Sequence, residues 1–377
     1  MTHTHLAPLT TWLTDPLSKE VSQSVERLRR SDDVGQVALM PDVHLAREVC
    51  IGAVVATTEL IYPSAVGGDI GCGMAALGFN AEASVIDDER SAAKILSGLY
   101  EFVPANKHRQ PRDLPESLSI SSISDSNLQR VAKRDGRVQL GTLGRGNHFL
   151  EFQAEDDGRL WVMVHSGSRA VGQAVMERYQ RSATAGTTGL KWLNTAEGQG
   201  QAYLADANWA RKYASENRLT MLKAVTQLLQ NLFGITAEWD SLVHCDHNHV
   251  QRELHDGELR WIHRKGAQSA KPDEPGIVPG SMGAPSFHTI GRGCEAALMS
   301  CSHGAGRKLS RTEARRTIGV KEFARQVGGL WFDHRRTVKL RDEAPSAYKD
   351  IRKVMKTQRV LTRAIRELRP VLTYKGI

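Results

Sequence analysis

The stretch Ile51-Gly52-Ala53-Val54-Val55-Ala56-Thr57-Thr58 is followed closely by Ala65-Val66-Gly67-Gly68-Asp69-Ile70-Gly71-Cys72-Gly73-Met74. The first is a run of small and β-branched residues and predicts a buried β-strand. The second contains too many glycines for a regular element and predicts a loop. This loop places a carboxylate, Asp69, three residues before a thiol, Cys72, and both side chains are ligand types for divalent metals. Together the two stretches predict a strand that leads into a site.

Strand and helix patterns are interspersed through the rest of the chain. Residues 161–165 and 259–263 are short apolar runs typical of strands, and residues 203–233 carry an apolar stripe typical of a helix in one or two pieces. Residues 345–368 have the clearest amphipathic pattern and predict a C-terminal helix. Because these elements do not alternate as regular β-α-β units, we expect an α+β fold with mixed sheets.

Composition is that of a globular protein with 377 residues, of which 40% are hydrophobic and 24% charged. No linker divides the chain, so we expect one catalytic domain over residues 1–377, with residues 81–137 as an exposed polar connection. No apolar run is long enough to span a bilayer, and the N-terminus lacks the basic and then apolar pattern of a signal peptide. These features predict a cytoplasmic protein with no membrane partner.

The cysteines and the charged residues indicate which bonds and which kind of partner we expect for this protein. The five cysteines are an odd number in a long chain, which favours metal ligation or burial over a disulfide framework. The net charge of +8 suits a polyanionic partner such as nucleic acid. The lysines and arginines between residues 349 and 366 form either a solvated helix face, which we slightly favour, or an RNA-binding track.

The stretch Cys301-Ser302-His303-Gly304-Ala305-Gly306-Arg307 carries the strongest chemical signal. Small residues let backbone N–H groups approach a phosphate, and an arginine adds a forked cation. A neutral imidazole held against a phosphate can attack it and form a phosphoramidate. Taken alone, the stretch is equally typical of a tight turn with a solvent-facing histidine.

Histidines beside glycine or serine extend the potential metal site. One or two divalent ions could be bound by five side chains that offer S, N and O atoms: Asp69, Cys72, His148, His165 and His247. The thiolate favours zinc, although the donor set also fits manganese and cobalt. We interpret five other histidines as hydrogen-bonded surface residues, namely His3, His5, His108, His255 and His334, and leave His244 and His249 open.

Glycine-rich turns lie between these histidines, at residues 141–146, 166–169, 279–283 and 303–307. None is a Walker loop or a dinucleotide-binding fingerprint, and each alone is more typical of a structural turn. Four such turns among metal-type histidines indicate phosphoryl or nucleotidyl transfer in a metal- and nucleotide-binding cleft.

The ordered motifs together resemble the RtcB-type RNA ligases. The resemblance runs from about Val37 to the C-terminus and rests on these stretches: Met40-Pro41-Asp42-Val43-His44, residues 65–74, Gly141-Thr142-Leu143-Gly144-Arg145-Gly146-Asn147-His148-Phe149, His165-Ser166-Gly167-Ser168-Arg169, Arg264-Lys265-Gly266-Ala267, Pro279-Gly280-Ser281-Met282-Gly283 and residues 301–307.

The resemblance implies a reaction. Such ligases join an RNA end with a 2′,3′-cyclic phosphate or 3′-phosphate to a 5′-hydroxyl end, using GTP and manganese. The resemblance makes His303 the histidine that is guanylylated. It also makes Asp69, Cys72, His148, His165 and His247 the ligands of two Mn2+ ions, with Cys72 shared between them. It therefore implies manganese where the thiolate alone favours zinc.

The resemblance also assigns the guanine-nucleotide contacts. They are Asn147, Glu151, Asn248, Ser286 and Lys375, together with Pro279, Gly280, Ser281 and Met282, and His303, Gly304, Ala305 and Gly306. Asp42 and Arg169 match positions that contact RNA or support the site.

The chain departs from the family pattern in three places. Ala46-Arg47-Glu48 replaces a Gly-Lys-Gly-like run, the segment between residues 81 and 137 is short, and Ile377 follows Lys375-Gly376. A compact member of this kind is similar to the subgroup associated with release factor H, which implies repair of damaged ribosomal RNA. Alternative hypotheses are a metal-dependent RNA phosphodiesterase or cyclic phosphatase, and a non-catalytic RNA-binding protein.

Overall fold

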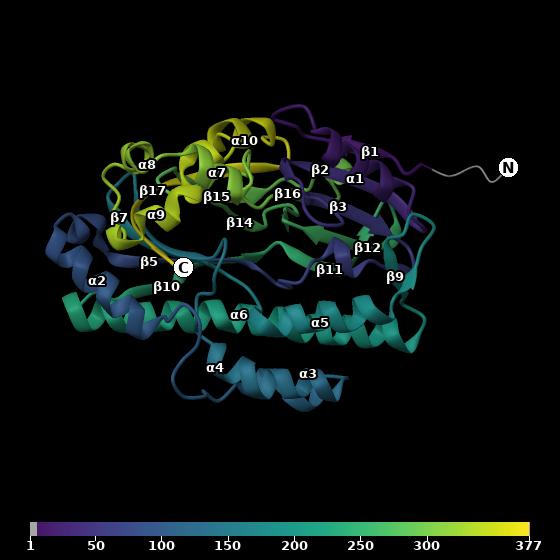
Figure 1. Ribbon diagram of the computed structural model, residues 1–377, viewed down its shortest axis with the longest axis horizontal. Helices are drawn as coiled ribbons and strands as arrows, with labels where there is room; N and C mark the ends of the chain where they lie inside the picture. The colour runs from purple at the N-terminus through teal and green to yellow at the C-terminus, as the bar shows by residue number, and fades with distance from the viewer. Residues whose placement is uncertain (1–5, 377) are drawn as a thin grey trace.

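The computed structural model describes residues 6–376 and has two main β-sheets packed side by side above a layer of helices (Figure 1). The larger sheet has the strand order β10-β5-β7-β6-β17-β15-β14, and its neighbouring strands are antiparallel. Its strands are β5 (Gly73–Glu82), β6 (Phe149–Glu155), β7 (Arg159–Ser166), β10 (Ala237–Asp246), β14 (Pro275–Val278), β15 (Ser286–Gly291) and β17 (Thr362–Lys375).

The second sheet has the order β1-β2-β3-β12-β11, with β1 parallel to β2 and the other pairs antiparallel. It contains β1 (Leu9–Thr11), β2 (Val34–His44), β3 (Ile51–Thr57), β11 (Asn248–His255) and β12 (Glu258–Lys265). Two small sheets complete the strands: β13 (Ala267–Ser269) pairs with β16 (Ser300–Ser302), and β9 (Lys191–Asn194) lies between β4 (Leu60–Ile61) and β8 (Thr184–Ala185).

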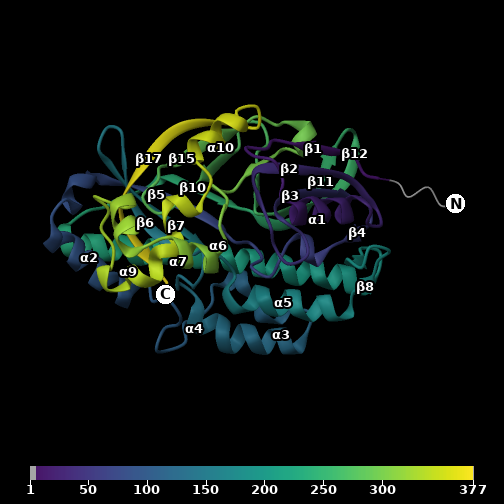
Figure 2. The same ribbon diagram turned by 45° about the horizontal axis from the view of Figure 1, so that its top comes forward.

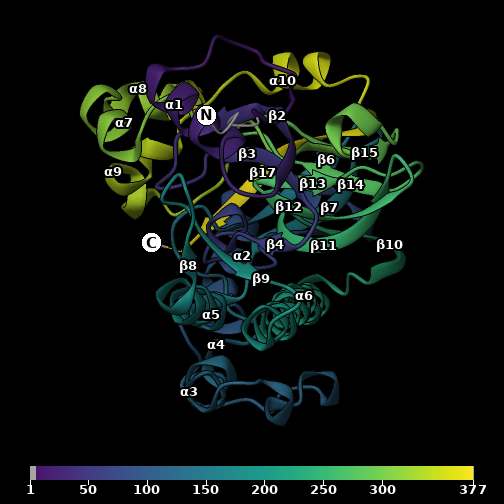
Figure 3. The same ribbon diagram turned by 90° about the vertical axis from the view of Figure 1, so that its right-hand side faces the viewer.

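The helices cover the sheets from two sides. The long α6 (Gly198–Phe233) and α5 (Arg169–Ser182) run beneath the sheets, and α3 (Ser126–Val131) lies outside that layer (Figure 3). The upper side carries α7 (Arg311–Thr317), α8 (Val320–Gln326), α9 (Thr337–Leu340) and α10 (Ile351–Thr357) (Figure 1). When this side is turned forward, α7, α9 and α10 lie in front of the sheets (Figure 2). The remaining helices are α1 (Lys19–Arg29), α2 (Glu89–Phe102) and α4 (Arg137–Gln139). Among residues 6–376, none of the helices has both the length and the apolar character needed to cross a bilayer.

The expected α+β fold with mixed sheets is confirmed. The strands expected at residues 51–58, 161–165 and 259–263 are β3, β7 and β12, and the helix expected at residues 203–233 is the single helix α6. The apolar face of α6 packs with α2 against the larger sheet, and Leu222, Val225 and Leu229 lie in this core with Leu77, Phe152 and Val164. Burial of these side chains fixes the sheet over the helices.

The amphipathic helix expected over residues 345–368 is wrong in its second half. Only the short 3-10 turn Pro345–Ala347 and α10 are helical; the chain then turns at Gln358 and enters β17, which pairs with both β15 and β6. Leu361 and Leu368, assigned to one apolar stripe, are buried in different cores, and Ile365 is exposed. Pairing of residues 362–368 with β15, continued by pairing of residues 368–375 with β6, outweighs a local pattern that fits a helix.

The expectation of an exposed connection at residues 81–137 is also corrected. The segment includes α2, whose Ala92, Ile95 and Leu99 are buried in the core of the larger sheet. Asp88 caps this helix through the backbone N–H of Ser91, 2.9 Å away. The three apolar side chains are spaced three and four residues apart, as on one face of a helix, but the many polar residues between them make the segment look exposed in the sequence.

Candidate functional site

The expected metal ligands converge because they lie at the same end of adjacent strands. Cys72 comes just before β5, and His165 lies in β7, where its register partners are Met74 and Phe149. His148 precedes Phe149 in the chain. His247 follows the last residue of β10, which is paired with Gly73 at the start of β5. The strand order β10-β5-β7-β6 thus gathers residues that are far apart in the sequence.

The ligand atoms form two overlapping groups around one thiol. The Cys72 sulfur lies 3.3 Å from His165 Nε2 and 3.5 Å from His148 Nε2. His148 Nε2 is also 2.8 Å from Asp69 Oδ2. One group contains Cys72, His165 and His247 and the other Asp69, Cys72 and His148, with the ligand atoms of each within 4.8 Å of one another. This arrangement matches the shared role expected for Cys72.

The chemistry of the cluster fits bound cations. Burial lowers the pKa of His165 and of His247 well below 6.5, so both imidazoles are neutral, the form that binds metals. Burial and the Asp69 carboxylate raise the pKa of the Cys72 thiol well above 9, and a bound cation would reverse this by stabilising the thiolate. The ring atom Nδ1 of His247 is buried and has no hydrogen-bond partner among residues 6–376.

A glycine lets the chain approach the cluster closely. A Cβ atom at Gly167 would lie 2.2 Å from Asp69 Oδ1, a distance that no side chain tolerates. The next residue, Ser168, donates its backbone N–H to the same oxygen at 3.1 Å. Burial raises the pKa of Asp69, but the adjacent His148 and the hydrogen bond from Cys72 outweigh this effect and bring it to about 2, so the carboxylate is ionised.

His303 is held by a carboxylate from the other main sheet. Oδ2 of Asp42, a fully buried residue of β2, accepts hydrogen bonds from His303 Nδ1 at 2.6 Å and from the His303 backbone N–H at 3.1 Å. A carboxylate can only accept, so the proton is on Nδ1 and Nε2 keeps its lone pair. The imidazole of His247 lies beside this ring, with centroids 4.6 Å apart. The potential nucleophile therefore adjoins the metal ligands.

A pocket opens directly beside His303. Eleven of the expected nucleotide contacts line it: Asn147, Glu151, Pro279, Gly280, Ser281, Met282, His303, Gly304, Ala305, Gly306 and Lys375. Gly306 has φ +74°, and a Cβ there would lie 2.4 Å from the backbone oxygen of Asp42, so only glycine permits this turn. The metal cluster shares His165 with the pocket wall.

Comparison with known proteins agrees with this geometry. The sequence profile of the family described as tRNA-splicing ligase RtcB matches residues 24–124 and 110–376. The chain belongs to the RtcB family. The RNA-splicing ligase RtcB of Escherichia coli strain K12 is 35% identical over 371 residues, covering 90% of each chain. The RNA-splicing ligase RtcB of Mycobacterium tuberculosis is 30% identical over 421 residues, covering 89% of this chain and 96% of its own. The resemblance inferred from the motifs is thereby confirmed.

Two of the nucleotide contacts expected for an RtcB-family chain lie outside the pocket lining. Asn248 faces the metal side, where its amide donates to the Asp69 carbonyl at 3.1 Å and its Oδ1 accepts from the Gly266 N–H at 2.8 Å. Ser286 is buried behind the loop of residues 279–283, and its Oγ accepts from the Gly280 N–H at 3.4 Å. Both side chains shape the loops around the pocket.

Several pocket residues of this RtcB-family chain were not assigned from the sequence. They include Phe149, Arg307, Glu343, Tyr348 and Thr373. The Tyr348 hydroxyl accepts from Arg307 Nη1 at 2.7 Å and donates to Glu343 at 2.8 Å. Arg307 belongs to a quoted motif, whereas Glu343 has no motif around it and Tyr348 lies in the segment wrongly expected to be helical.

The pocket is closed at one end by ion pairs. Glu343 binds Lys375 and also accepts from Arg311 Nη1 at 2.9 Å. Arg311 in turn donates to Asn147. Burial raises the pKa of Glu343, but Lys375 and Arg311 outweigh this and bring it to about 2. The negative charge of Glu343 therefore holds Lys375 at the pocket wall.

Glu151 has the opposite electrostatic character. Its two oxygens accept from Gln153 Nε2 and from Thr373 Oγ1, both at 2.8 Å. Burial raises the pKa of Glu151 to about 7, and these hydrogen bonds only partly oppose the effect. Near neutral pH this side chain is therefore only partly ionised.

Arg169 lies under the glycine loop that precedes His148. Its Nε donates to Thr142 Oγ1 at 3.2 Å and its Nη2 to the Ala105 carbonyl at 3.3 Å. A Cβ at Gly144 would lie 2.3 Å from both Arg169 Nη1 and His148 Nδ1. Arg169 thus supports the loop that presents His148.

The histidines interpreted as hydrogen-bonded surface residues have partners away from the cluster, but the interpretation is wrong for His255, which is buried between Glu253 and Glu295. The exposed His334 lies against Phe332 with the two rings tilted by 50°, and His108 is half-buried near Arg112. Of the two left open, His244 accepts from Arg218 Nε at 2.8 Å, and His249 Nδ1 lies 2.6 Å from Asp246. His3 and His5 lie outside the described residues.

Proposed function

We propose that this RtcB-family chain is a GTP- and Mn2+-dependent RNA ligase that joins a 2′,3′-cyclic phosphate or 3′-phosphate end to a 5′-hydroxyl end. The observation that carries the proposal is His303, whose Nδ1 is held by Asp42 and whose ring lies between the pocket and His247. An imidazole with Nε2 available beside a phosphate-sized, glycine-lined pocket is arranged for nucleophilic attack.

The proposed reaction has three steps, each of which forms one bond and breaks another. His303 Nε2 attacks the α-phosphorus of GTP, so a P–N bond forms and pyrophosphate leaves. An oxygen of the RNA 3′-phosphate then attacks this phosphorus, and the P–N bond breaks to regenerate the imidazole. The RNA 5′-hydroxyl finally attacks the activated 3′-phosphate, a phosphodiester bond forms, and GMP leaves with the electron pair. A 2′,3′-cyclic phosphate must first be hydrolysed to the 3′-phosphate.

Other residues of the chain would assist these three steps. Asp42 keeps the proton on Nδ1 and stabilises the positive charge that His303 gains on attack. The backbone N–H groups of residues 303–306 and Lys375 suit the phosphates and the base end of a nucleotide. Asp69, Cys72, His148, His165 and His247 would hold two divalent cations, which neutralise phosphate charge.

The test uses GTP labelled on the α-phosphate, with Mn2+ and the purified chain. We expect an acid-labile labelled protein band that is absent in His303→Ala and unchanged in His334→Ala, whose histidine is exposed and does not line the pocket. RNA with a cyclic-phosphate end and a 5′-hydroxyl end should be sealed only when GTP is present. A His303→Ala protein that still seals RNA would contradict the proposed nucleophile.

A metal-dependent RNA phosphodiesterase is the second candidate, because the metal cluster is complete without any nucleotide contact. It would turn over cyclic-phosphate RNA without GTP and yield no sealed product. Within the ligase proposal the physiological role is RNA repair or tRNA splicing, and damaged ribosomal RNA acting with release factor H is one such role. We propose a cytoplasmic location and no membrane partner.

A further inference from the structure

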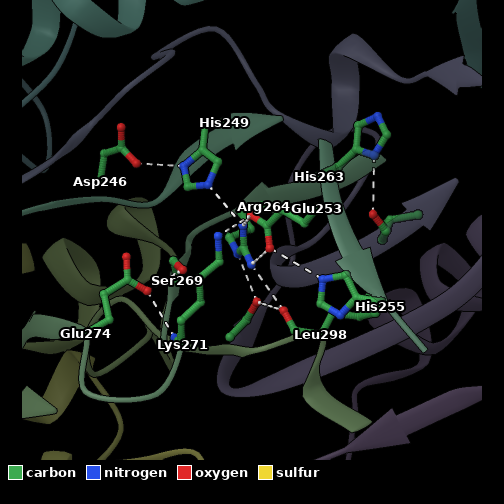
Figure 4. A network of polar contacts seen from close by, with 12 residues as sticks. Asp246, His249, Glu253, His255, His263, Arg264, Ser269, Lys271, Glu274 and Leu298 are labelled. Carbon is green, nitrogen blue, oxygen red and sulfur yellow. Dashed lines mark hydrogen bonds and ion pairs between the residues drawn. The ribbon is translucent and has the colours of Figure 1, made fainter. Parts of the chain in front are cut away.

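We propose that Arg264 is a positioning residue for His303. Its side chain joins β16, the short strand that ends just before His303, to β11, the strand that follows the His247 turn. This inference rests on the proposed function, in which His303 is the nucleophile. Arg264 lies in β12, is fully buried, and stands at the centre of the polar network in Figure 4.

Every N–H group of Arg264 has a partner. Its Nε donates to Ser300 Oγ at 2.9 Å, and its Nη1 donates to Glu253 Oε1 at 2.6 Å and to His249 Nε2 at 3.2 Å. Its Nη2 donates to Glu253 Oε2 and to the Leu298 carbonyl, both at 3.1 Å. A guanidinium has five N–H donors in a rigid fork, so no other side chain can make this set of contacts.

One side of the network contacts the residues that precede His303 in the chain, from Leu298 to Ser300. Leu298 and Met299 have φ +50° and +46°, a left-handed conformation that costs energy for residues with a side chain. The Leu298 carbonyl accepts from Arg264 and also from Ser300 Oγ, at 2.8 Å. The chain then forms β16, which is three residues long, and His303 follows at once.

The pairing of β16 is too short to fix His303 without help. Its only strand partner among the described residues is β13, also of three residues, and a two-stranded ladder of this length is marginal. Arg264 and Ser300 add buried, charge-assisted hydrogen bonds at the start of β16. We therefore assign the placement of the start of this strand to the guanidinium rather than to the ladder, while Gln358 and Gln268 hydrogen-bond to the backbone of Ser302 at its end.

The other side of the network ends at the metal ligands. His249 lies in β11, with Nε2 accepting from Arg264 and Nδ1 2.6 Å from Asp246 Oδ1. Asp246 is also paired with Arg211 of α6. His247 stands between Asp246 and Asn248 in the chain, so its turn is held at both ends. Arg264 thus gives the strand before His303 and the turn around His247 a common support.

The network also has a far end that offers a matched control. His255 Nδ1 lies 3.2 Å from Glu295 Oε2, and the Glu295 side chain is half exposed. Glu295→Gln perturbs this end without touching Arg264, Ser300 or His249. If the network only stabilised the fold, substitutions at either end would lower the rate to a similar extent. If it positions His303, only substitutions at the end that contacts β16 should lower the rate.

The experiment measures the rate of the labelled His303 adduct over a range of GTP concentrations for the intact chain, Ser300→Ala, Arg264→Lys and Glu295→Gln. Ser300→Ala removes one contact to β16, and Arg264→Lys removes the fork but keeps the charge. We expect both to lower the maximal rate by about 10- to 100-fold, since misplacement of a reacting group by about 1 Å costs about 100-fold. The GTP concentration for half-maximal rate should be unchanged, and Glu295→Gln should match the parent chain.

Amide hydrogen exchange of residues 298–307 provides a readout that is independent of the chemistry. We expect faster exchange in Ser300→Ala and Arg264→Lys, and parent-like exchange in Glu295→Gln. Parent-like rates and exchange in the first two variants would overturn the inference, as would an equal loss in Glu295→Gln. If the parent chain itself forms no adduct, the proposed function fails, and the exchange data alone decide whether Arg264 anchors β16.

Discussion

Replacing Asp42 with asparagine tests the central chemical claim, that a buried carboxylate prepares His303 for attack. Asp42 Oδ2 accepts from both Nδ1 and the backbone N–H of His303, while its Oδ1 is buried and has no hydrogen-bond partner in the described chain. Asparagine has nearly the same shape, so the fold should tolerate it. It removes the negative charge and brings an N–H₂ group into a site that needs only acceptors.

The size of the effect follows from two contributions. A hydrogen bond to a charged partner is worth about 1.5–3 kcal/mol, or about 10- to 150-fold in rate at 1.36 kcal/mol per tenfold. An asparagine that turns its amide nitrogen toward His303 also moves the ring proton to Nε2, the atom that must attack. A tautomer change of this type costs about 10⁴-fold in serine proteases. We therefore expect adduct formation by Asp42→Asn to be slower by about 10-fold, if only the charged hydrogen bond is lost, to about 10⁴-fold, if the tautomer also changes.

The assay is single-turnover formation of the labelled adduct at saturating GTP, with metal content and melting temperature measured on the same samples. Asp33→Asn is the matched control, because Asp33 Oδ2 accepts from the backbone N–H groups of Thr58, Glu59 and Leu60 at 3.0, 2.7 and 2.7 Å. It should lower the melting temperature and leave the rate intact. An Asp42→Asn rate within about threefold of the parent chain would refute the tautomer argument, because that argument requires the cost of a lost charged hydrogen bond.

Other substitutions test the cluster and the pocket. Cys72→Ala removes the ligand common to both groups and should lower the bound metal, measured by atomic absorption, below half of the parent content. Because burial raises the pKa of Glu151 to about 7, the stability associated with its proton is lost as pH rises from about 4.5 through 7. Glu151→Gln should therefore leave the unfolding free energy nearly unchanged at pH 4 and raise it at pH 8 by about 3 kcal/mol, which would appear as a higher melting temperature. Lys375→Met removes a cation from the pocket wall and leaves Glu343 with one ion-pair partner fewer. Because a charged hydrogen bond is worth about 1.5 kcal/mol or more, we expect the half-saturating GTP concentration to rise by about 10-fold. The effect on the maximal rate should be smaller.

The convergence of the candidate metal ligands could be expected in part, because each is marked by its local sequence. Cys72 lies in a glycine loop, and His165 ends a strand before a Ser-Gly-Ser turn. Such places expose side chains at a strand end, where ligands are common. What the sequence did not contain is the strand order that brings them together, because β10 and β7 flank β5 only through pairings between residues that are far apart in the chain.

The upper side of the pocket was less predictable for a related reason. Residues 361–368 fit a helical stripe, yet from Thr362 they form a strand, because β15 offers an edge to residues 362–368 and β6 pairs with the same strand from Leu368 onward. Lys375 was assigned from the family motif, but its partner Glu343 stands in a charged stretch without glycine, histidine or cysteine. Its role depends on burial beside Lys375 and Arg311, and burial of a charge cannot be seen in local composition.

The pairing of His303 with Asp42 shows where chemical function depends on packing between sheets. The two residues are 261 positions apart; Asp42 belongs to the five-stranded sheet, and His303 follows a strand of a two-stranded one. The ligands next to His303 come from the ends of the seven-stranded sheet. Neither sheet alone contains a site that could transfer a nucleotide. A change in how the sheets meet would separate nucleophile, carboxylate and metals while leaving each sheet folded, so loss of activity without loss of stability is the signature to expect from substitutions at this junction.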